Sequence, residues 1–62
     1  MWEYKIKLIK FKTYIELTVD LNEEGNNGWE IISYEEIKPE NYSASYSAKI
    51  LFKRKKEIQH DN

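Results

Sequence analysis

Hydrophobic and charged residues alternate along the first segment of the chain. The apolar members of this alternation are Trp2, Tyr4, Ile6 and Leu8. A period of two residues is typical of a strand that buries one face. The alternation is interrupted where Leu8 and Ile9 adjoin, which predicts a bulge or the end of regular pairing near Ile9. The segment therefore predicts a strand with its apolar side turned towards a core.

The next segment fits two patterns. Apolar residues alternate as in a strand, yet Leu17 and Leu21 lie one helical turn apart. Helix is favoured for the later half, and residues 13–18 remain open to either structure. Gly25 suits the left-handed position that ends many helices, and residues 26–28 are typical of a loop.

Two further strands are expected. Residues 29–37 carry Trp29 and Ile31 on one side and Ile32 and Tyr34 on the other, so this strand is predicted to be central or covered by a partner. After the break at Pro39, residues 42–53 alternate strictly between apolar and polar positions.

The order of elements predicts an α+β fold. It is a single β-α-β-β domain over residues 1–54, in which one helix packs on one face of a three-stranded antiparallel sheet. Residues 55–62 have too little apolar content to pack and are expected to form a flexible tail. The predicted core consists of Trp2, Tyr4, Ile6, Leu8, Leu17, Leu21, Trp29, Ile31, Tyr46, Ile50 and Phe52.

Composition narrows the ways in which so short a chain can be stabilised. A domain of 62 residues buries only about 60% of the surface of its unfolded chain. The chain has no cysteine and a single histidine, so disulfides are excluded, and neither a metal nor another cofactor is expected. Close packing of the aromatic residues and self-association are the remaining sources of stability.

No apolar run approaches the ~20 residues that span a membrane. The first twelve residues also interleave lysines where a secretory signal needs an unbroken apolar stretch. We therefore expect a cytoplasmic protein with no membrane partner.

The net charge of -1 conceals a segregation of charge along the chain. Residues 1–15 and 41–62 are basic, whereas residues 16–40 carry eight acids and one lysine. If the first and third strands are neighbours, their polar positions are expected to form one electropositive sheet face. The predicted ligand-binding residues of this basic face are Lys5, Lys7, Ser45, Ser47, Lys49, Lys53 and Arg54.

Enzymatic chemistry finds little support in the sequence. The carboxylate pairs at residues 23–24 and 35–36 are sequence neighbours and do not converge, and the serines lack a nucleophile-elbow motif. No catalytic residue is therefore assigned, and we expect a protein that is not an enzyme. The absence of evident exposed aromatic residues for base stacking argues against specific nucleic-acid binding.

Three signatures together resemble a known family. The chain opens WEYKI, continues with LN, a glycine and GWEIIS, and ends its last strand with FKR. This arrangement resembles the small bacterial and phage family called domain of unknown function 4177, over residues 2–54. The resemblance implies the β-α-β-β fold and no established activity. Its matched structural positions are Trp2, Tyr4, Leu21, Gly25, Gly28 and Trp29.

The sequence thus predicts a non-enzymatic binding module that acts as a homo-oligomer. Its expected partners are a second copy of the chain and an anionic small molecule or an acidic protein. Lysines oppose stacking of the basic face on its own copy, whereas edge pairing or a contact through the acidic helix avoids this conflict. The alternative function is a phage-type inhibitor that sequesters an anionic nucleotide signal or blocks a host defence protein.

Overall fold

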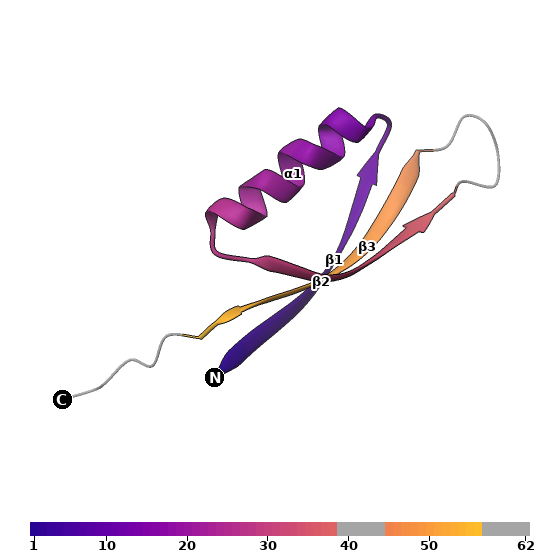
Figure 1. Cartoon of the computed structure of the whole chain (residues 1–62). Coiled ribbons are helices and arrows are strands. Elements are labelled where there is room, and N and C mark those ends of the chain that lie inside the picture. The colour runs from indigo at the N-terminus through magenta and orange to yellow at the C-terminus, as the bar shows by residue number, and fades with distance from the viewer. Residues whose placement is uncertain (39–44, 57–62) are drawn as a thin grey trace.

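Four elements follow one another in the order β-α-β-β (Figure 1). The structure is a computed structural model that describes residues 1–38 and 45–56. The elements are β1 (Trp2–Phe11), α1 (Tyr14–Asn26), β2 (Glu30–Ile37) and β3 (Tyr46–Lys55). The predicted α+β class is confirmed, with one helix and a three-stranded antiparallel sheet.

The last strand, β3, occupies the centre of the sheet, and the order across it is β1-β3-β2. Both neighbours run antiparallel to β3, so β1 and β2 are parallel to each other. The first and third strands are neighbours, which is the condition that the predicted basic face required. The prediction that residues 29–37 form the central strand is wrong, because among the described residues β2 pairs with β3 alone and lies at an edge of the sheet. The fully buried apolar residues Ala48, Ile50 and Phe52 belong to the central strand β3. The alternative, that a partner covers residues 29–37, stays a prediction.

A bulge in β2 accounts for the pattern that suggested a central strand. Ile31 pairs with Phe52 and Ser33 pairs with Leu51, so Ile32 has no partner in the ladder. An extra residue shifts the alternation by one position. In the sequence, the apolar residues before the bulge and those after it therefore stand in opposite phases of the alternation, which imitates a strand with two apolar faces. β2 is nevertheless an edge strand, in which every residue except Glu36 is exposed.

Thr13 is the N-cap of α1, and the ambiguity over residues 13–18 is settled in favour of helix from Tyr14 onwards. The Thr13 hydroxyl accepts a hydrogen bond from the backbone N–H of Glu16 at 3.3 Å. In return the Glu16 carboxylate accepts from the backbone N–H groups of Thr13 and Lys12. These contacts form a capping box, which satisfies donors that the first turn leaves without helical partners.

α1 ends at Asn26, and the left-handed residue beyond its end is Gly28 rather than the predicted Gly25. Gly25 lies inside the last turn of α1, whereas Gly28 has a φ of 87°. The N–H of Trp29 donates to the carbonyl of Glu24 and the N–H of Gly28 to that of Gly25, both at 3.0 Å. This pair of bonds is a Schellman motif, in which the residue with positive φ is usually glycine.

The core is small and lies between α1 and the sheet. The buried apolar residues of the described chain are Ile9, Phe11, Leu17, Ala48, Ile50 and Phe52, and Leu21 and Trp29 pack against them. The prediction that Trp2, Tyr4, Ile6 and Leu8 contribute to the core is wrong, because each is half or more exposed. Ile31 and Tyr46, which were also expected in the core, are 45% and 39% exposed.

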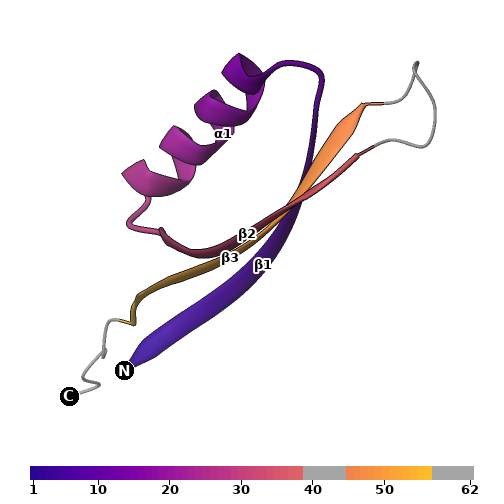
Figure 2. The same cartoon turned by 45° about the vertical axis from the view of Figure 1, so that its right-hand side comes forward.

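The two views of the ribbon place α1 on one side of a curved, twisted sheet (Figures 1 and 2). No element among residues 1–38 and 45–56 covers the opposite side, which we call the open face. The first residues of β1 and the last residues of β3 extend beyond the helix (Figure 1).

The strand β3 continues through Lys55, one residue into the segment predicted as a tail. The backbone N–H of Lys56 then donates to the carbonyl of Met1 at 2.9 Å. The tail prediction for residues 57–62 and the predicted start of the third strand at 42–44 lie outside the described residues. No helix in the described part of the chain has both the length and the apolar character needed to cross a membrane.

The two glycines give opposite predictions for the same substitution. No heavy atom would obstruct a Cβ at either position, so only backbone conformation distinguishes them. Gly28→Ala should lower the free energy of unfolding by about 1 kcal/mol, because alanine resists a positive φ. Gly25→Ala should raise it by about 0.5 kcal/mol, because alanine favours helix. Urea unfolding of both variants measures the difference, and a reversed order would contradict the placement of the helix end.

Candidate interaction surface

The apolar side of β1 changes from one face of the sheet to the other partway along the strand. Ile9 and Phe11 face α1 and are buried, and they share that face with Lys5 and Lys7. The strand shows no register shift up to Phe11, so the predicted bulge or strand end near Ile9 is wrong. The adjoining Leu8 and Ile9 instead mark where the apolar residues pass from the open face to the helix face.

The first half of β1 consequently displays its apolar side chains on the open face. These side chains and a neighbour on β3 form a surface that we call the open-face strip: Trp2, Tyr4, Ile6, Leu8 and Leu51. Ile6 is 66% exposed and lies directly opposite Leu51 in the ladder. A contiguous exposed apolar surface of this kind is characteristic of a site of interaction.

Charged residues border the open-face strip along β3. Lys53 lies opposite Tyr4 and Lys49 opposite Leu8, on either side of Leu51. The Lys53 ammonium is 4.4 Å from the centre of the Trp2 ring, a cation–π distance. One strand farther away, β2 places Glu30 and Glu35 opposite these two lysines. The open face therefore has an apolar column, a basic column and an acidic column in adjacent strands.

The predicted basic face is divided between the two sides of the sheet. Ser47, Lys49 and Lys53 lie on the open face. Lys5, Lys7 and Arg54 lie on the helix face, so the prediction that they share a surface with the others is wrong. Ser45 immediately precedes β3 and takes no part in the ladder.

The division follows from the register between the two strands. Lys5 pairs with Phe52 and Lys7 pairs with Ile50, and paired residues point to the same side of a sheet. The polar side of β1 thus shares a face with the apolar side of β3. The sequence shows the alternation within each strand, but it does not show which side of one strand will share a sheet face with which side of the next.

Lys5 and Lys7 are held under the helix by Glu24, which is 6% exposed. The Lys5 ammonium donates to Glu24 Oε1 at 2.7 Å and the Lys7 ammonium to Oε2 at 2.9 Å. Lys5 also lies 4.5 Å from the centre of the Trp29 ring. Glu24 continues the inner face of α1 that begins with Leu17 and Leu21, so the helix meets the sheet through apolar contacts at one end and ion pairs at the other.

This contact shifts the ionisation of both partners. Hydrogen bonds from Lys5 and then Lys7 hold the pKa of Glu24 below its usual value, and partial burial opposes them. The hydrogen bond to Glu24 raises the pKa of Lys7. Both shifts favour the charged forms, so the cluster is an ion-pair network at neutral pH with little tendency to exchange protons.

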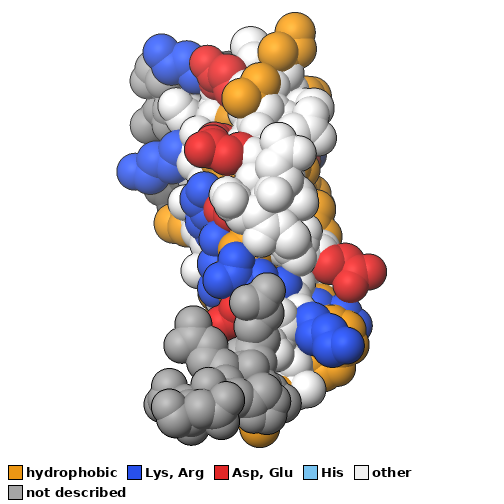
Figure 3. Space-filling model, turned by 90° about the vertical axis from the view of Figure 1, so that its left-hand side faces the viewer, with side chains coloured by type: hydrophobic (Ala, Val, Ile, Leu, Met, Phe, Trp, Pro, Cys, Tyr) orange, Lys and Arg blue, Asp and Glu red, His pale blue; other side chains and the backbone are white. Residues whose placement is uncertain are grey.

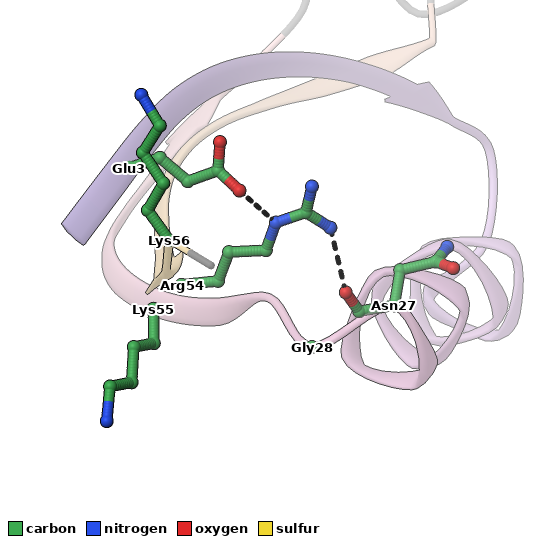
Figure 4. Close-up of a pocket in the computed structure, with 6 residues that line it drawn as sticks. All are labelled: Glu3, Asn27, Gly28, Arg54, Lys55 and Lys56. Carbon is green, nitrogen blue, oxygen red and sulfur yellow. Dashed lines mark hydrogen bonds and ion pairs between the residues drawn. The ribbon is translucent and has the colours of Figure 1, made fainter. Parts of the chain in front are cut away.

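A second cluster surrounds a cleft of about 630 Å³ at the end of the sheet where α1 stops (Figure 4). Arg54 Nη1 donates to the carbonyl of Asn27 at 3.0 Å, and its Nε donates to Glu3. The guanidinium carbon is 4.3 Å from the centre of the Trp29 ring. Lys55 and Lys56 extend away from Arg54 in different directions (Figure 4).

The cleft is better suited to holding the structure together than to binding an anion. Arg54 is already engaged by Glu3 and by a carbonyl at the C-terminal end of α1, which carries partial negative charge. Residues 1–38 and 45–56 contain no group of three or more acidic, histidine or cysteine side chains that could hold a metal ion.

Comparisons with protein-family models, with curated proteins and with solved structures found no match to the chain. The resemblance to the domain of unknown function 4177 therefore stays a prediction. The structural positions that the resemblance implies differ in burial. Leu21 and Trp29 pack against the core and Gly28 forms the helix exit, whereas Trp2 and Tyr4 are surface residues.

Two features of the candidate site were not predicted, although the sequence carries a signal for each. Leu8 and Ile9 indicated the change of face, although their adjacency was interpreted as an irregular strand. Glu24 follows Leu21 by three residues and Leu17 by seven, the spacing of one helical face. An acid at that position predicts a basic partner on the sheet.

Protonation of Glu24 at acidic pH should lower the free energy of unfolding. The pKa of Glu24 is lower in the folded protein than its usual value of 4.5. The contribution of the Glu24 carboxylate to the free energy of unfolding is therefore complete above pH 4.5, and it is lost as the pH falls through the pKa that Glu24 has in the folded protein. At neutral pH Glu24→Gln should lower the free energy of unfolding by about 1–2 kcal/mol. The exposed neighbour supplies the control, Glu23→Gln, which should change it by less than about 0.5 kcal/mol.

Urea unfolding at a series of pH values measures this contribution. The difference between the native chain and Glu24→Gln should shrink as the pH is lowered below 4.5. A difference that stays constant down to the lowest pH would show that Glu24 acts through packing and not through its charge.

Proposed function

We propose that the chain is a small non-enzymatic interaction module that acts as a homo-oligomer through the open-face strip. The observation that carries the proposal is the exposure of Trp2, Tyr4, Ile6 and Leu8 on one side of a regular strand. The helix covers the other side, and the open-face strip has no covering element within the described chain.

The balance between buried and exposed apolar residues supports association. Only two of the large side chains in the core, Ile50 and Phe52, are completely enclosed. Four consecutive apolar positions of β1 are 50–66% exposed. A three-stranded sheet with one helix is near the lower limit of independent stability, so burial of this surface by a second copy stabilises the fold as well as the complex.

The open-face strip by itself supplies a moderate driving force. Completing the burial of its five side chains contributes on the order of 5 kcal/mol, given 1.5–3 kcal/mol for a fully buried apolar side chain and roughly half exposure. Association costs about 4–15 kcal/mol in lost translational and rotational freedom. The surface that meets the open-face strip must therefore contribute apolar area of its own.

The alternative of a protein that sequesters an anionic nucleotide draws less support. It required one continuous basic face, whereas Lys5 and Lys7 are engaged by Glu24 and Arg54 by Glu3. Of the lysines in the predicted basic face, Lys49 and Lys53 remain on the open face, where they adjoin apolar side chains on one side and glutamates on the other. That setting suits a protein surface better than a phosphate group.

Gel filtration coupled to light scattering tests the proposed assembly. The native chain should have a mass that is a multiple of 7.5 kDa. Ile6→Glu should restore the single-chain mass, because it places a charge in the centre of the open-face strip. Ile37→Glu is the matched control, since Ile37 is exposed on β2 and its ladder partner is Ser47.

Circular dichroism of both variants confirms that the fold is retained. A native mass of 7.5 kDa at all concentrations would overturn the proposed function. Loss of assembly in Ile37→Glu together with retention in Ile6→Glu would place the contact elsewhere on the molecule.

A further inference from the structure

The outer side of α1 carries a second apolar surface that the fold does not use. Ile15 is 76% exposed and Val19 is 60% exposed. They lie four residues apart, on the same side of the helix, and opposite the inward-facing Leu17. Neither residue is needed to hold α1 on the sheet, which is accomplished by Leu17, Leu21 and Glu24.

Acidic residues accompany this apolar pair. On a helical projection Glu16 and Glu23 lie beside Ile15 and Val19, towards one flank. The whole of α1 contains two further acids, Asp20 and Glu24, and no lysine or arginine. A space-filling view shows acidic and basic side chains interleaved on one side of the molecule, with hydrophobic side chains exposed at its upper end and along one margin (Figure 3).

The two exposed apolar surfaces are complementary in charge and lie on opposite sides of the domain. The outer side of α1 has an acidic flank, whereas the open-face strip has a basic flank formed by Lys49 and Lys53. One contact between copies can bury both apolar surfaces and bring the opposite charges together. Stacking two open faces would instead leave Ile15 and Val19 exposed.

We propose that the outer side of α1 of one copy packs on the open-face strip of the next copy. This inference rests on the proposed function and specifies its contact. Such a contact is heterologous, so each copy offers one surface of each kind and assembly proceeds head to tail. The product is a ring if the rotation between copies closes and a filament if it does not.

The outer side of α1 is long enough to lie along most of the open-face strip. Trp2 to Leu8 spans about 20 Å at roughly 3.3 Å per strand residue. Ile15 to Asn26 spans about 16 Å at roughly 1.5 Å per helical residue. A helix of this length therefore covers most of the open-face strip, and the apolar pair Ile15 and Val19 occupies about 6 Å of that length at the same rise per residue.

Mixing two variants tests the head-to-tail contact. The first variant, Ile6→Glu, damages the open-face strip and keeps the helix surface intact. The second, Ile15→Lys combined with Val19→Lys, damages the helix surface and places positive charge opposite Lys49 and Lys53. Lysine is a good helix former, so α1 should be retained, which circular dichroism checks.

Each variant alone should have the single-chain mass of 7.5 kDa by light scattering. An equimolar mixture should form a complex of twice that mass, because one undamaged helix surface meets one undamaged strip. The complex should stop at two chains, since both of its free surfaces are damaged.

The other outcomes separate this inference from the proposed function. A helix variant that keeps the native oligomer would overturn the head-to-tail contact and leave assembly through the open-face strip intact. Two monomeric variants that fail to combine would also overturn it. A native chain that is itself monomeric would overturn the proposed function.

Discussion

Successive side chains of a β-strand point to opposite faces, and this constraint governs how β1 can be used. Because Leu8 and Ile9 are adjacent apolar residues, a strand that stays regular must present one to each face. Ile9 and Phe11 are then buried in the core beneath α1, whereas the apolar residues before them lie exposed on the opposite face. One regular strand thus contributes to the core with one half and displays an exposed apolar surface with the other.

The ion pairs of Glu24 follow from that change of face. Where the apolar residues of β1 point away from the helix, Lys5 and Lys7 point towards it. A helix with an entirely apolar inner face would leave those ammonium groups against hydrocarbon, which is costly. Glu24 on α1 accepts both, and Trp29 lies beside Lys5. The helix is therefore held over both halves of β1 by different chemistry.

Much of the fold could be predicted from local sequence. The strands, the helix and the β-α-β-β order follow from periodicity, and Gly25 with the loop residues after it indicated a helix end three residues before the left-handed Gly28. Two features depended on pairing and could not be derived from one strand at a time. The register sets Lys5 beside Phe52, and the bulge at Ile32 changes the phase of β2. Both decide which residues share a face, and the composition of the candidate surface depends on them.

The central claim is that the apolar side of the first half of β1 is buried by another copy of the chain. Acrylamide quenching of Trp2 fluorescence across a dilution series, in a Trp29→Phe background that leaves Trp2 as the only tryptophan, tests it most directly. Trp2 is half exposed in the single chain, so quenching should be weak at high protein concentration and should increase as dilution separates the copies. Strong quenching at every concentration would contradict the claim.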